Sequence, residues 1–444
     1  MIDIKEIREN REKFKKAAKD KGFNVHIDNL LEIDSTLRES KMKVQYVSTE
    51  MNKIGKSVPN LPEDKRQVAI EKLTLLKQNM AKLHEGLKEI QLKFDEMMLL
   101  VPQPADEDVP LGKDDTENVE IRREGEIRQF DFEPKDHVQL GKALDIIDIE
   151  RGVKLAGTRN YFLKGDGALL HWAVLRFAMD FMVGKGYVPM SVPVLMKDEA
   201  MTGTGFFPGS EDQTYRMETD QLNLAGTAEV PLTAYRMGEI LKAEELPLKY
   251  VAMSTCFRRE AGAAGKDTYG LYRIHQFDKI EQVVICENSV EQSNRFHEEI
   301  LANAEAVMKA LELPYRVANV CTGDLGRGQA KKYDIETWMP SRNDYCETHS
   351  ASKFYEFQAR RMNLRYRDSS CVMRDAYSGE RKNARRNTQY AIRFCHTLNN
   401  TVIASPRILI PILELYQNSD GSVTIPKVLR PYMGGKEVIV ARRS

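Results

Sequence analysis

The stretch from Cys256 to Val284, which reads CFRREAGAAGKDTYGLYRIHQFDKIEQVV, decides the fold of this chain. It joins two strand-like runs through a glycine-rich segment, which predicts an antiparallel hairpin. Three glycines mark the turn between the two strands: Gly262, Gly265 and Gly270.

Charged and aromatic side chains recur along this hairpin at strand spacing. Because side chains alternate across a strand, we expect Arg258 and Glu260 on one face of the first strand. Arg273, Phe277 and Glu281 are expected on one face of the second. Arginine clamps phosphate oxygens through paired N–H donors, and an aromatic ring stacks on a base. The set predicts a pocket for an anionic, aromatic ligand such as a nucleotide; the alternative is a solvated hairpin whose charges pair with one another.

A second candidate anion site is Ser405-Pro406-Arg407, which precedes the apolar run 408–416. Serine as N-cap and proline at the first helical position predict that a helix begins there. An arginine at the positive end of a helix is misplaced unless an anion binds beside it. The alternative is a surface arginine that extends into solvent.

The N-terminal third repeats apolar residues about every 3.5 positions in two runs separated by GKSVPNLPEDK, residues 55–65. This pattern predicts an antiparallel helical hairpin, and the second helix would be about 50 Å long, so we expect it to project as an arm. The alternative for such a hairpin is a purely structural or dimerising role. The predicted seam consists of Leu30, Ile33, Leu37, Ser40, Val44, Val47, Met51 and Ile54 in the first helix, and Leu73, Leu76, Met80, Leu83, Leu87, Ile90, Phe94 and Met97 in the second.

The chain is long enough for two domains. We expect an N-terminal domain at 1–100, a linker rich in proline and acidic residues at 101–126, and a larger domain at 127–444. An α+β fold with an antiparallel sheet is predicted for the larger domain. The sequence contains neither a GxGxxG that opens a βαβ unit nor a GxxxxGK[ST] phosphate loop. The expected helices are 166–184 and 228–243, and the expected strands are 248–257, 273–285 and 390–397.

Composition restricts the class of protein. Lysine and arginine total 66, as do aspartate and glutamate, so RNA would have to meet local basic patches such as residues 1–21 and 374–386. The alternative for those patches is a solvated helix face and a surface loop. The six cysteines show no CxxC spacing, which favours reduced thiols in a cytoplasmic protein. We expect no apolar run long enough to span a bilayer and no signal peptide at the N-terminus.

These residues resemble seryl-tRNA synthetases, which are class II aminoacyl-tRNA synthetases. The run 257–281 is similar to the second signature motif of that class. Four other segments support the resemblance over essentially the whole chain. They are GKGYVPMSVPVL at 184–195, GTAEVPLT around Thr227, ETHSAS at 347–352 and HTLNNTVIASPRIL at 396–409.

The resemblance implies a class II antiparallel sheet with flanking helices, preceded by a coiled-coil arm. It also implies a serine–tRNA ligase that activates L-serine with ATP to seryl-adenylate and then transfers serine to the 3′-terminal ribose of serine tRNA. The implied catalytic residues are Arg258, Glu260, Arg273 and Arg407; these four bind ATP together with Phe277 and Glu347.

The resemblance further implies a magnesium ion held by the oxygens of Glu347 and Ser350, which suits a hard cation. The implied serine ligands are Thr227, Glu281, Asn399 and Thr401. In this family the arm meets the long variable arm of the tRNA, and the motif at 184–195 implies a homodimer. The arm residues available for phosphate contact are Lys41, Lys43, Lys53, Lys56, Lys65 and Arg66.

Two other functions stay open. One is a catalytically retired synthetase paralog that acts as an RNA-binding or scaffold protein, although such a protein needs no ATP site. The other is a ligase that charges a carrier protein, although such relatives lack the arm. The chain departs from the family at Ala351-Ser352-Lys353, where many members have Cys-Ser-Asn, and this change would alter either serine affinity or the packing behind the pocket.

Overall fold

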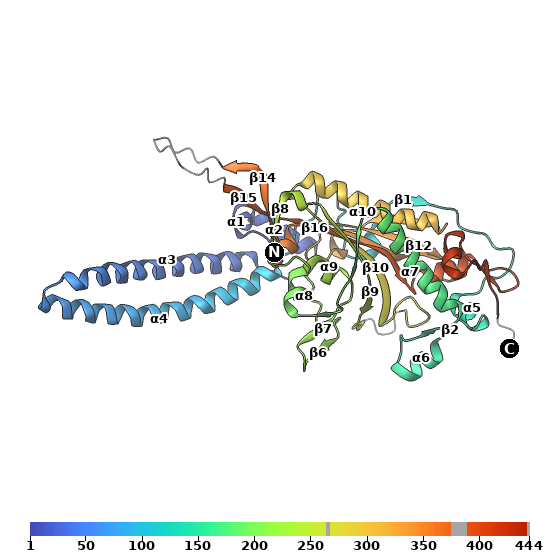
Figure 1. Ribbon diagram of the computed structural model, residues 1–444, viewed down its shortest axis with the longest axis horizontal. Coiled ribbons are helices and arrows are strands. Elements are labelled where there is room, and N and C mark those ends of the chain that lie inside the picture. Colours follow the sequence, from blue (N-terminus) through green and yellow to red (C-terminus); the bar gives the residue numbers. More distant parts are fainter. Residues whose placement is uncertain (263–266, 374–388, 442–444) are drawn as a thin grey trace. The chain divides into compact units, whose positions relative to one another are not determined.

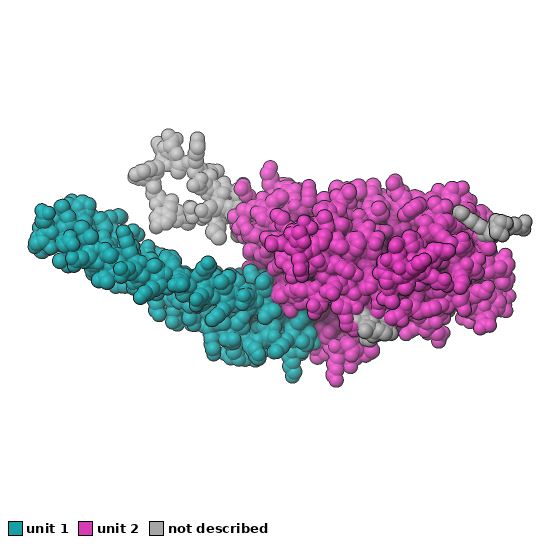
Figure 2. Space-filling model, turned by 90° about the horizontal axis from the view of Figure 1, so that it is seen from below, with its two compact units in different colours: residues 1–104 teal, residues 105–444 magenta. Residues whose placement is uncertain are grey.

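The computed structural model describes residues 1–262, 267–373 and 389–441. Two compact units divide the chain between Pro104 and Ala105 (Figure 2). Gly265 and the basic stretch 374–386 lie outside the described residues.

The first unit is a helical hairpin with two short helices at its base. Helices α3 (Ile27–Ser57) and α4 (Glu63–Leu100) run side by side, as the apolar repeat predicts (Figure 1). The break between them is shorter than predicted, because α3 continues through Gly55 and only residues 58–62 separate the two helices. The connection ends at Pro62, because a proline ring is tolerated at the start of a helix but not in its interior.

An ion pair joins the base of the first unit. Helices α1 (Ile4–Glu9) and α2 (Arg11–Asp20) precede the hairpin, and the guanidinium of Arg8 donates Nε–H and Nη2–H to the two carboxylate oxygens of Asp34, each at 2.7 Å. The Asp34 side chain on α3 is only 3% exposed, and Arg38 also donates to it at 3.2 Å. The pair therefore ties α1 to the buried side of α3.

The second unit is built on a sheet of eight strands in the described part of the chain. Neighbouring strands are antiparallel, apart from β4, which runs parallel to β9 at one edge. This confirms the predicted antiparallel class. The spatial order is β1 (Val119–Glu124), β11 (Tyr315–Asn319), β12 (Lys331–Met339), β13 (Asp344–Tyr355), β16 (His396–Ser405), β10 (Gln276–Cys286), β9 (Leu248–Phe257) and β4 (Val188–Ser191).

Helices cover both faces of this sheet (Figure 1). Helices α7 (Asp166–Gly184) and α10 (Val290–Ala310) pack on one face and enclose the larger apolar core. A smaller core lies on the other face with α9 (Glu229–Ala234) and α11 (Phe357–Met362). The remaining elements include α5 (His137–Ala143), α6 (Ile149–Ala156), α8 (Asp198–Thr204), α12 (Leu409–Leu415), β5 (Leu195–Met196), β6 (Arg216–Met217), β7 (Leu222–Leu224), β8 (Ile240–Lys242), β14 (Arg365–Met373) and β15 (Gln389–Phe394).

The prediction of a linker over 101–126 is wrong in its last part. Residues 119–124 form β1, which pairs with β11 at the edge of the sheet. The strand is mostly exposed. An ion pair attaches it to α10, because Arg122 donates to both carboxylate oxygens of Glu305 on that helix. A strand stabilised by ion pairs carries little apolar periodicity, which is why the pattern did not reveal it.

Several predicted elements need correction. The strand expected at 273–285 begins only at Gln276, and the one expected at 390–397 is two strands that meet at Cys395. The helix expected at 228–243 ends at Ala234, and β8 follows at 240–242. Gly238 has φ +82°, a conformation that a right-handed helix excludes, and its N–H donates to Met362 O at 2.8 Å. The predicted helix 166–184 and strand 248–257 agree with the structure.

The expectation that no apolar run is long enough to span a bilayer is wrong for helix α7. Its 19 residues are long and apolar enough for one by length and composition. Much of this apolar surface packs in the larger core, where Leu170, Val174 and Ala178 are almost fully buried. A core helix and a membrane span have the same composition, so composition alone does not distinguish them.

We expect Arg8→Leu to loosen the base of the first unit. The substitution leaves the buried Asp34 carboxylate with fewer donors, at a cost of about 1–3 kcal/mol. Hydrogen–deuterium exchange of residues 4–20 should therefore accelerate, while β9 and β10 keep their protection. The control is Arg11→Leu, since Arg11 pairs with Asp28, a half-exposed carboxylate. Equal exchange in the two variants would contradict this role of Arg8.

Candidate functional site

A pocket opens at the middle of the large sheet, on the face opposite α7. Strands β10, β13 and β16 and the loops at their ends form its walls. An adjoining pocket shares Arg258, Glu260, Glu347 and Arg407 with it and adds Arg273. The first pocket is lined by Arg258, Glu260, Tyr272, Ile274, Phe277, Lys279, Glu347, Thr348, Ser350, Thr401, Ala404 and Arg407. The structure thus brings together most of the side chains singled out in the sequence.

Arg258 lies directly after β9 and over the ring of Phe277. Its backbone N–H donates to His275 O at 2.9 Å, and its Nε–H donates to Gly226 O at 3.4 Å. The guanidinium carbon is 5.2 Å from the centroid of the Phe277 ring. A flat base inserted between the two groups needs a separation of about 7 Å. A base therefore stacks on Phe277 only when the Arg258 side chain moves aside.

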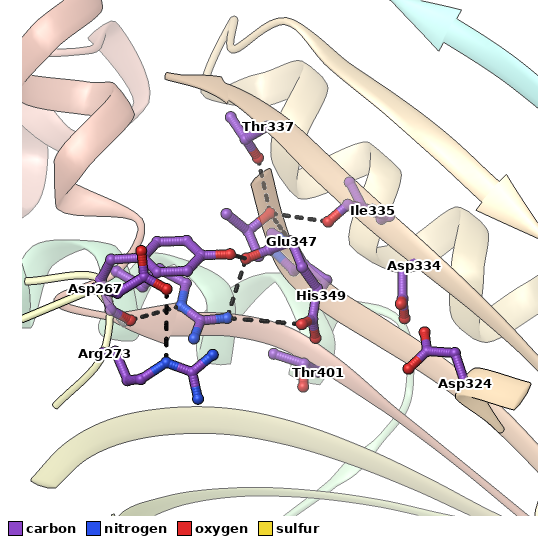
Figure 3. Close-up of polar contacts among 12 residues, drawn as sticks. Asp267, Arg273, Asp324, Asp334, Ile335, Thr337, Glu347, His349 and Thr401 are labelled. Carbon is purple, nitrogen blue, oxygen red and sulfur yellow. Dashed lines mark hydrogen bonds and ion pairs between the residues drawn. The ribbon is translucent and has the colours of Figure 1, made fainter. Parts of the chain in front are cut away.

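The expected strand placement is wrong for Arg258, Glu260 and Arg273, because β9 ends at Phe257 and β10 begins at Gln276. Glu260 instead has φ +53°, and its carboxylate accepts from Arg273 Nη1 at 2.7 Å. Arg273 also lies beside Asp267, with Nε 3.6 Å from the carboxylate (Figure 3). Both residues lie outside the strands, so they do not meet through strand alternation.

Arg407 crosses from the end of β16 to β13. Its Nε–H donates to Tyr272 O at 3.1 Å and its Nη1–H to Glu347 O at 3.0 Å, while its guanidinium carbon lies 4.3 Å from the centroid of the Tyr272 ring. The predicted helix start is wrong, because β16 includes Ser405 and α12 begins at Leu409. Arg407 is thus held by carbonyl oxygens in the turn before the helix.

Glu347 and Ser350 both face the pocket although they are three residues apart. Regular alternation would put them on opposite faces of β13, but the register shifts between Ile335 and Glu336 of the partner strand, which leaves Thr348 as the extra residue. Figure 3 shows Glu347 and Thr401, which belong to the neighbouring strands β13 and β16. The bulge therefore gathers a carboxylate and a hydroxyl on one wall.

The charge of Glu347 is governed by its neighbours. Partial removal from water raises the pKa of Glu347, but the positive charges of Arg407 and Lys332 outweigh this effect and hold the pKa below its ordinary value. The group is ionised at neutral pH. An anionic oxygen beside the Ser350 hydroxyl is a donor set that fits a hard divalent cation. Within the described residues, no group of three or more His, Cys, Asp or Glu side chains forms a metal site.

The buried carboxylate of Glu281 lies next to the first pocket, against two residues that line it, Lys279 and Thr401, and we call the surroundings of this carboxylate the recess. Its side chain is 2% exposed, and its Oε2 lies 3.5 Å from Thr227 Oγ1, 3.4 Å from Thr401 Oγ1 and 2.5 Å from Lys279 Nζ. Asn399, the fourth predicted serine ligand, is also buried and lies on the same strand as Thr401. Thr227, Glu281 and Thr401 therefore converge.

Two residues of the recess were not named as ligands from the sequence, although Glu229 belongs to the segment GTAEVPLT that resembles the family's amino-acid-binding loop. Lys279 lies between Phe277 and Glu281 on the pocket face of β10, so the period-two pattern could have identified it. Glu229 begins α9 in an otherwise apolar segment, and its Oε1 accepts from Gln358 Nε2 at 2.8 Å. Burial and the nearby charge of Glu281 raise the pKa of Glu229 to about 7.

The departure at 351–353 lies behind the pocket. Ala351 is fully buried, and Lys353 Nζ pairs with the carboxylate of Asp106 at 2.6 Å. Neither residue lines either pocket. The geometry favours the packing interpretation of this departure over a change in serine affinity.

Family models match both units of the chain. Residues 1–104 match the seryl-tRNA synthetase N-terminal domain, and residues 213–415 match the class II tRNA synthetase core domain of the G, H, P, S and T enzymes. The serine–tRNA ligase of Deinococcus radiodurans is 44% identical over 439 residues, which cover 99% of each chain. That of Rubrobacter xylanophilus is 40% identical over 445 residues and covers 100% of both chains.

Solved structures agree in fold along the whole length. Seryl-tRNA synthetase from Pyrococcus horikoshii, solved with ATP, superposes with a TM-score of 0.89 at 36% identity and covers 100% of both chains. The cytoplasmic serine–tRNA ligase from Naegleria fowleri, solved with AMP, has a TM-score of 0.83 at 30% identity and covers 98% of this chain and 96% of that one. With both units matched, and with full-length relatives above 40% identity, the chain belongs to the serine–tRNA ligase family.

Proposed function

We propose that this protein activates L-serine with ATP to seryl-adenylate and transfers the seryl group to the 3′-terminal ribose of serine tRNA. The single observation that carries the proposal is that three guanidinium groups line one pair of adjoining pockets beside the buried Glu281 carboxylate, which contacts the pocket residues Lys279 and Thr401. One ligand that has both phosphates and an ammonium group complements that arrangement of charge. Membership of the family supports the same reaction.

In the proposed site, the cationic side chains bind the triphosphate. Arg258 meets the α-phosphate, Arg407 the γ-phosphate, and Phe277 stacks on adenine. Glu260 and Arg273, which pair with each other at 2.7 Å, contact the adenine or triphosphate. Guanidinium groups suit this task because their paired donors match phosphate oxygens. The ATP in the Pyrococcus horikoshii complex supports a nucleotide here.

Serine occupies the recess beside Glu281. Its ammonium meets the Glu281 carboxylate and Thr227, while Asn399 and Thr401 meet the hydroxyl. A site built to bind a hydroxyl rejects the analogue that lacks it by a large factor, about 10⁴ in favourable cases. Alanine is therefore a poor substrate.

The reaction needs positioning more than a protein nucleophile. The serine carboxylate attacks the α-phosphorus in line, the α–β phosphate bond breaks, and pyrophosphate leaves. The 3′-terminal ribose hydroxyl of the tRNA then attacks the acyl carbon, and AMP leaves. Arg258 and Arg407 hold the charged oxygens throughout. Glu347 and Ser350 would hold a magnesium ion, which would supply positive charge to neutralise the phosphates.

The helical hairpin serves as the tRNA-binding arm in this proposal, and phosphate contacts along it read RNA shape without reading sequence. We further propose a homodimer, supported by exposed apolar side chains near the edge strand β4, including Trp172, Val188 and Met253. A cytoplasmic location is supported by the cysteines, since the five whose side chains the structure describes are free thiols.

The retired paralog is disfavoured by the pocket itself. A scaffold has no need to hold Arg258, Arg407 and Glu347 around a common space. The alternative of a ligase for a carrier protein is disfavoured by the helical hairpin and its match to the seryl-tRNA synthetase N-terminal domain.

ATP–pyrophosphate exchange with each amino acid in turn tests the proposed activity. We expect exchange with serine alone, and a loss of about 100-fold or more in Arg258→Ala, because a positioned donor to the reacting phosphate is removed. The control is Arg259→Ala, which changes the adjacent exposed arginine outside both pockets. A folded protein that shows no exchange with any amino acid would refute the activity and favour the retired paralog.

The proposed magnesium ligands have a separate test. Glu347→Gln should raise the magnesium concentration for half-maximal exchange about tenfold, because a neutral amide replaces the anionic ligand. Excess magnesium should restore most of the rate. If the magnesium dependence of Glu347→Gln matches that of the wild type, Glu347 is not a metal ligand.

Glu229 should make stability depend on pH. Its pKa of about 7 in the folded state lies above its ordinary value of 4.5. The folded protein thus keeps a proton that the unfolded chain loses, so stability falls as pH rises from about 4.5 to 7 and then levels off, by about 3 kcal/mol in all. Glu229→Gln removes this slope. Denaturant unfolding at pH 5 and pH 8 measures it, with the exposed Glu218→Gln as control; equal slopes in Glu229→Gln and wild type would contradict the raised pKa.

A further inference from the structure

A buried histidine on α7 bridges two of the strands that form the pocket. His171 is 7% exposed, and its Nδ1 lies 2.8 Å from Ser405 Oγ on β16. Its Nε2 lies 3.0 Å from Asp278 Oδ2 on β10. Helix α7 packs against β9, β10 and β16, so the imidazole enters the sheet from the core face.

The two partners of His171 belong to one row across three strands. Asp278 lies directly opposite Ser405 on β16 and opposite Thr255 on β9. Thr255 Oγ1 donates to Asp278 Oδ1 at 2.7 Å. The chain Thr255–Asp278–His171–Ser405 therefore joins β9, β10 and β16 through side chains, in addition to the backbone ladder.

Each strand of this row leads into the nucleotide end of the pocket. Thr255 is three residues before Arg258, Asp278 directly follows Phe277, and Ser405 is two residues before Arg407. Phe277 and Ala404 line the pocket, whereas their neighbours Asp278 and Ser405 point to the opposite face. The row therefore joins the ends of these strands on the core face. The proposed ATP ligands lie on the opposite, pocket face of the same strand ends.

The order serine, histidine, aspartate is also that of a hydrolase triad, but the environment excludes that role. Ser405 is fully buried on the core face of the sheet, so a substrate cannot reach its hydroxyl. The hydrogen bonds instead satisfy polar groups that would be costly to bury alone.

We infer that His171 is a positioning residue for ATP: by holding Asp278 and Ser405 together, it sets the relative placement of Phe277 and Arg407. The inference rests on the proposed serine activation. A leucine at this position leaves the buried Ser405 hydroxyl and the Asp278 carboxylate short of a partner. The strand ends then relax to satisfy them, which shifts the ring and the guanidinium that face the nucleotide.

The test compares His171→Leu, His171→Gln and Leu175→Ala in pyrophosphate exchange with serine. We expect His171→Leu to raise the KM for ATP about tenfold, since small misplacements of binding groups are costly. The KM for serine should change by less than about twofold, because the hydrogen bonds that His171 and Asp278 make in the described residues do not reach the side chains around Glu281. His171→Gln, whose amide keeps a donor near Asp278, should recover most of the loss.

Leu175→Ala is the matched control, because Leu175 is a buried core residue one turn further along α7. It should lower the Tm without changing the KM for ATP. If His171→Leu does not fold, Asp278→Asn, which removes the carboxylate that His171 contacts, supplies the same readout. A KM for ATP equal to that of the wild type in whichever of these two variants folds would overturn the inference. Absence of exchange in the wild type would refute the proposed function instead.

Discussion

A buried ion pair on one strand, Lys279 with Glu281, is the interaction on which the pocket depends. Both side chains are almost fully buried, and their charged atoms lie 2.5 Å apart. A carboxylate removed from water is tolerated only when a cation or several donors accompany it. Because side chains alternate along β10, Phe277, Lys279 and Glu281 share one face. One strand therefore presents a ring, a cation and a carboxylate in sequence.

The other residues of the site continue the same arrangement, with positive charge at one end of the pocket and negative charge at the other. At one end, Arg258 and Arg407 are anchored by backbone carbonyls, with much of their positive charge facing the pocket. At the other end, Thr227 and Thr401 surround the Glu281 carboxylate. Electrostatic interactions are stronger away from bulk water. A ligand that is anionic at one end and cationic at the other is therefore attracted at both ends of the pocket. The aminoacyl-adenylate reaction brings those two ends together in one molecule.

Much of this could be predicted from the sequence, because periodicity and residue chemistry are local. The helical hairpin followed from apolar spacing, and the antiparallel sheet followed from the glycine-rich hairpin between β9 and β10. The exceptions have physical causes. Edge strand β1 is stabilised by ion pairs, the bulge at Thr348 depends on the partner strand, and Glu260 meets Arg273 through a loop. Such features depend on tertiary contacts, which a local pattern does not contain.

The most direct test of the account is calorimetric titration with a non-hydrolysable seryl-adenylate analogue, beside AMP, serine and the matching alanyl analogue. If one pocket joins a phosphate clamp to a serine recess, the seryl analogue should bind at least about 100-fold more tightly than AMP or serine, as expected of a ligand that resembles a reaction intermediate. It should also bind far more tightly than the alanyl analogue. Equal affinity for the seryl and alanyl analogues, or no gain over AMP, would contradict the account.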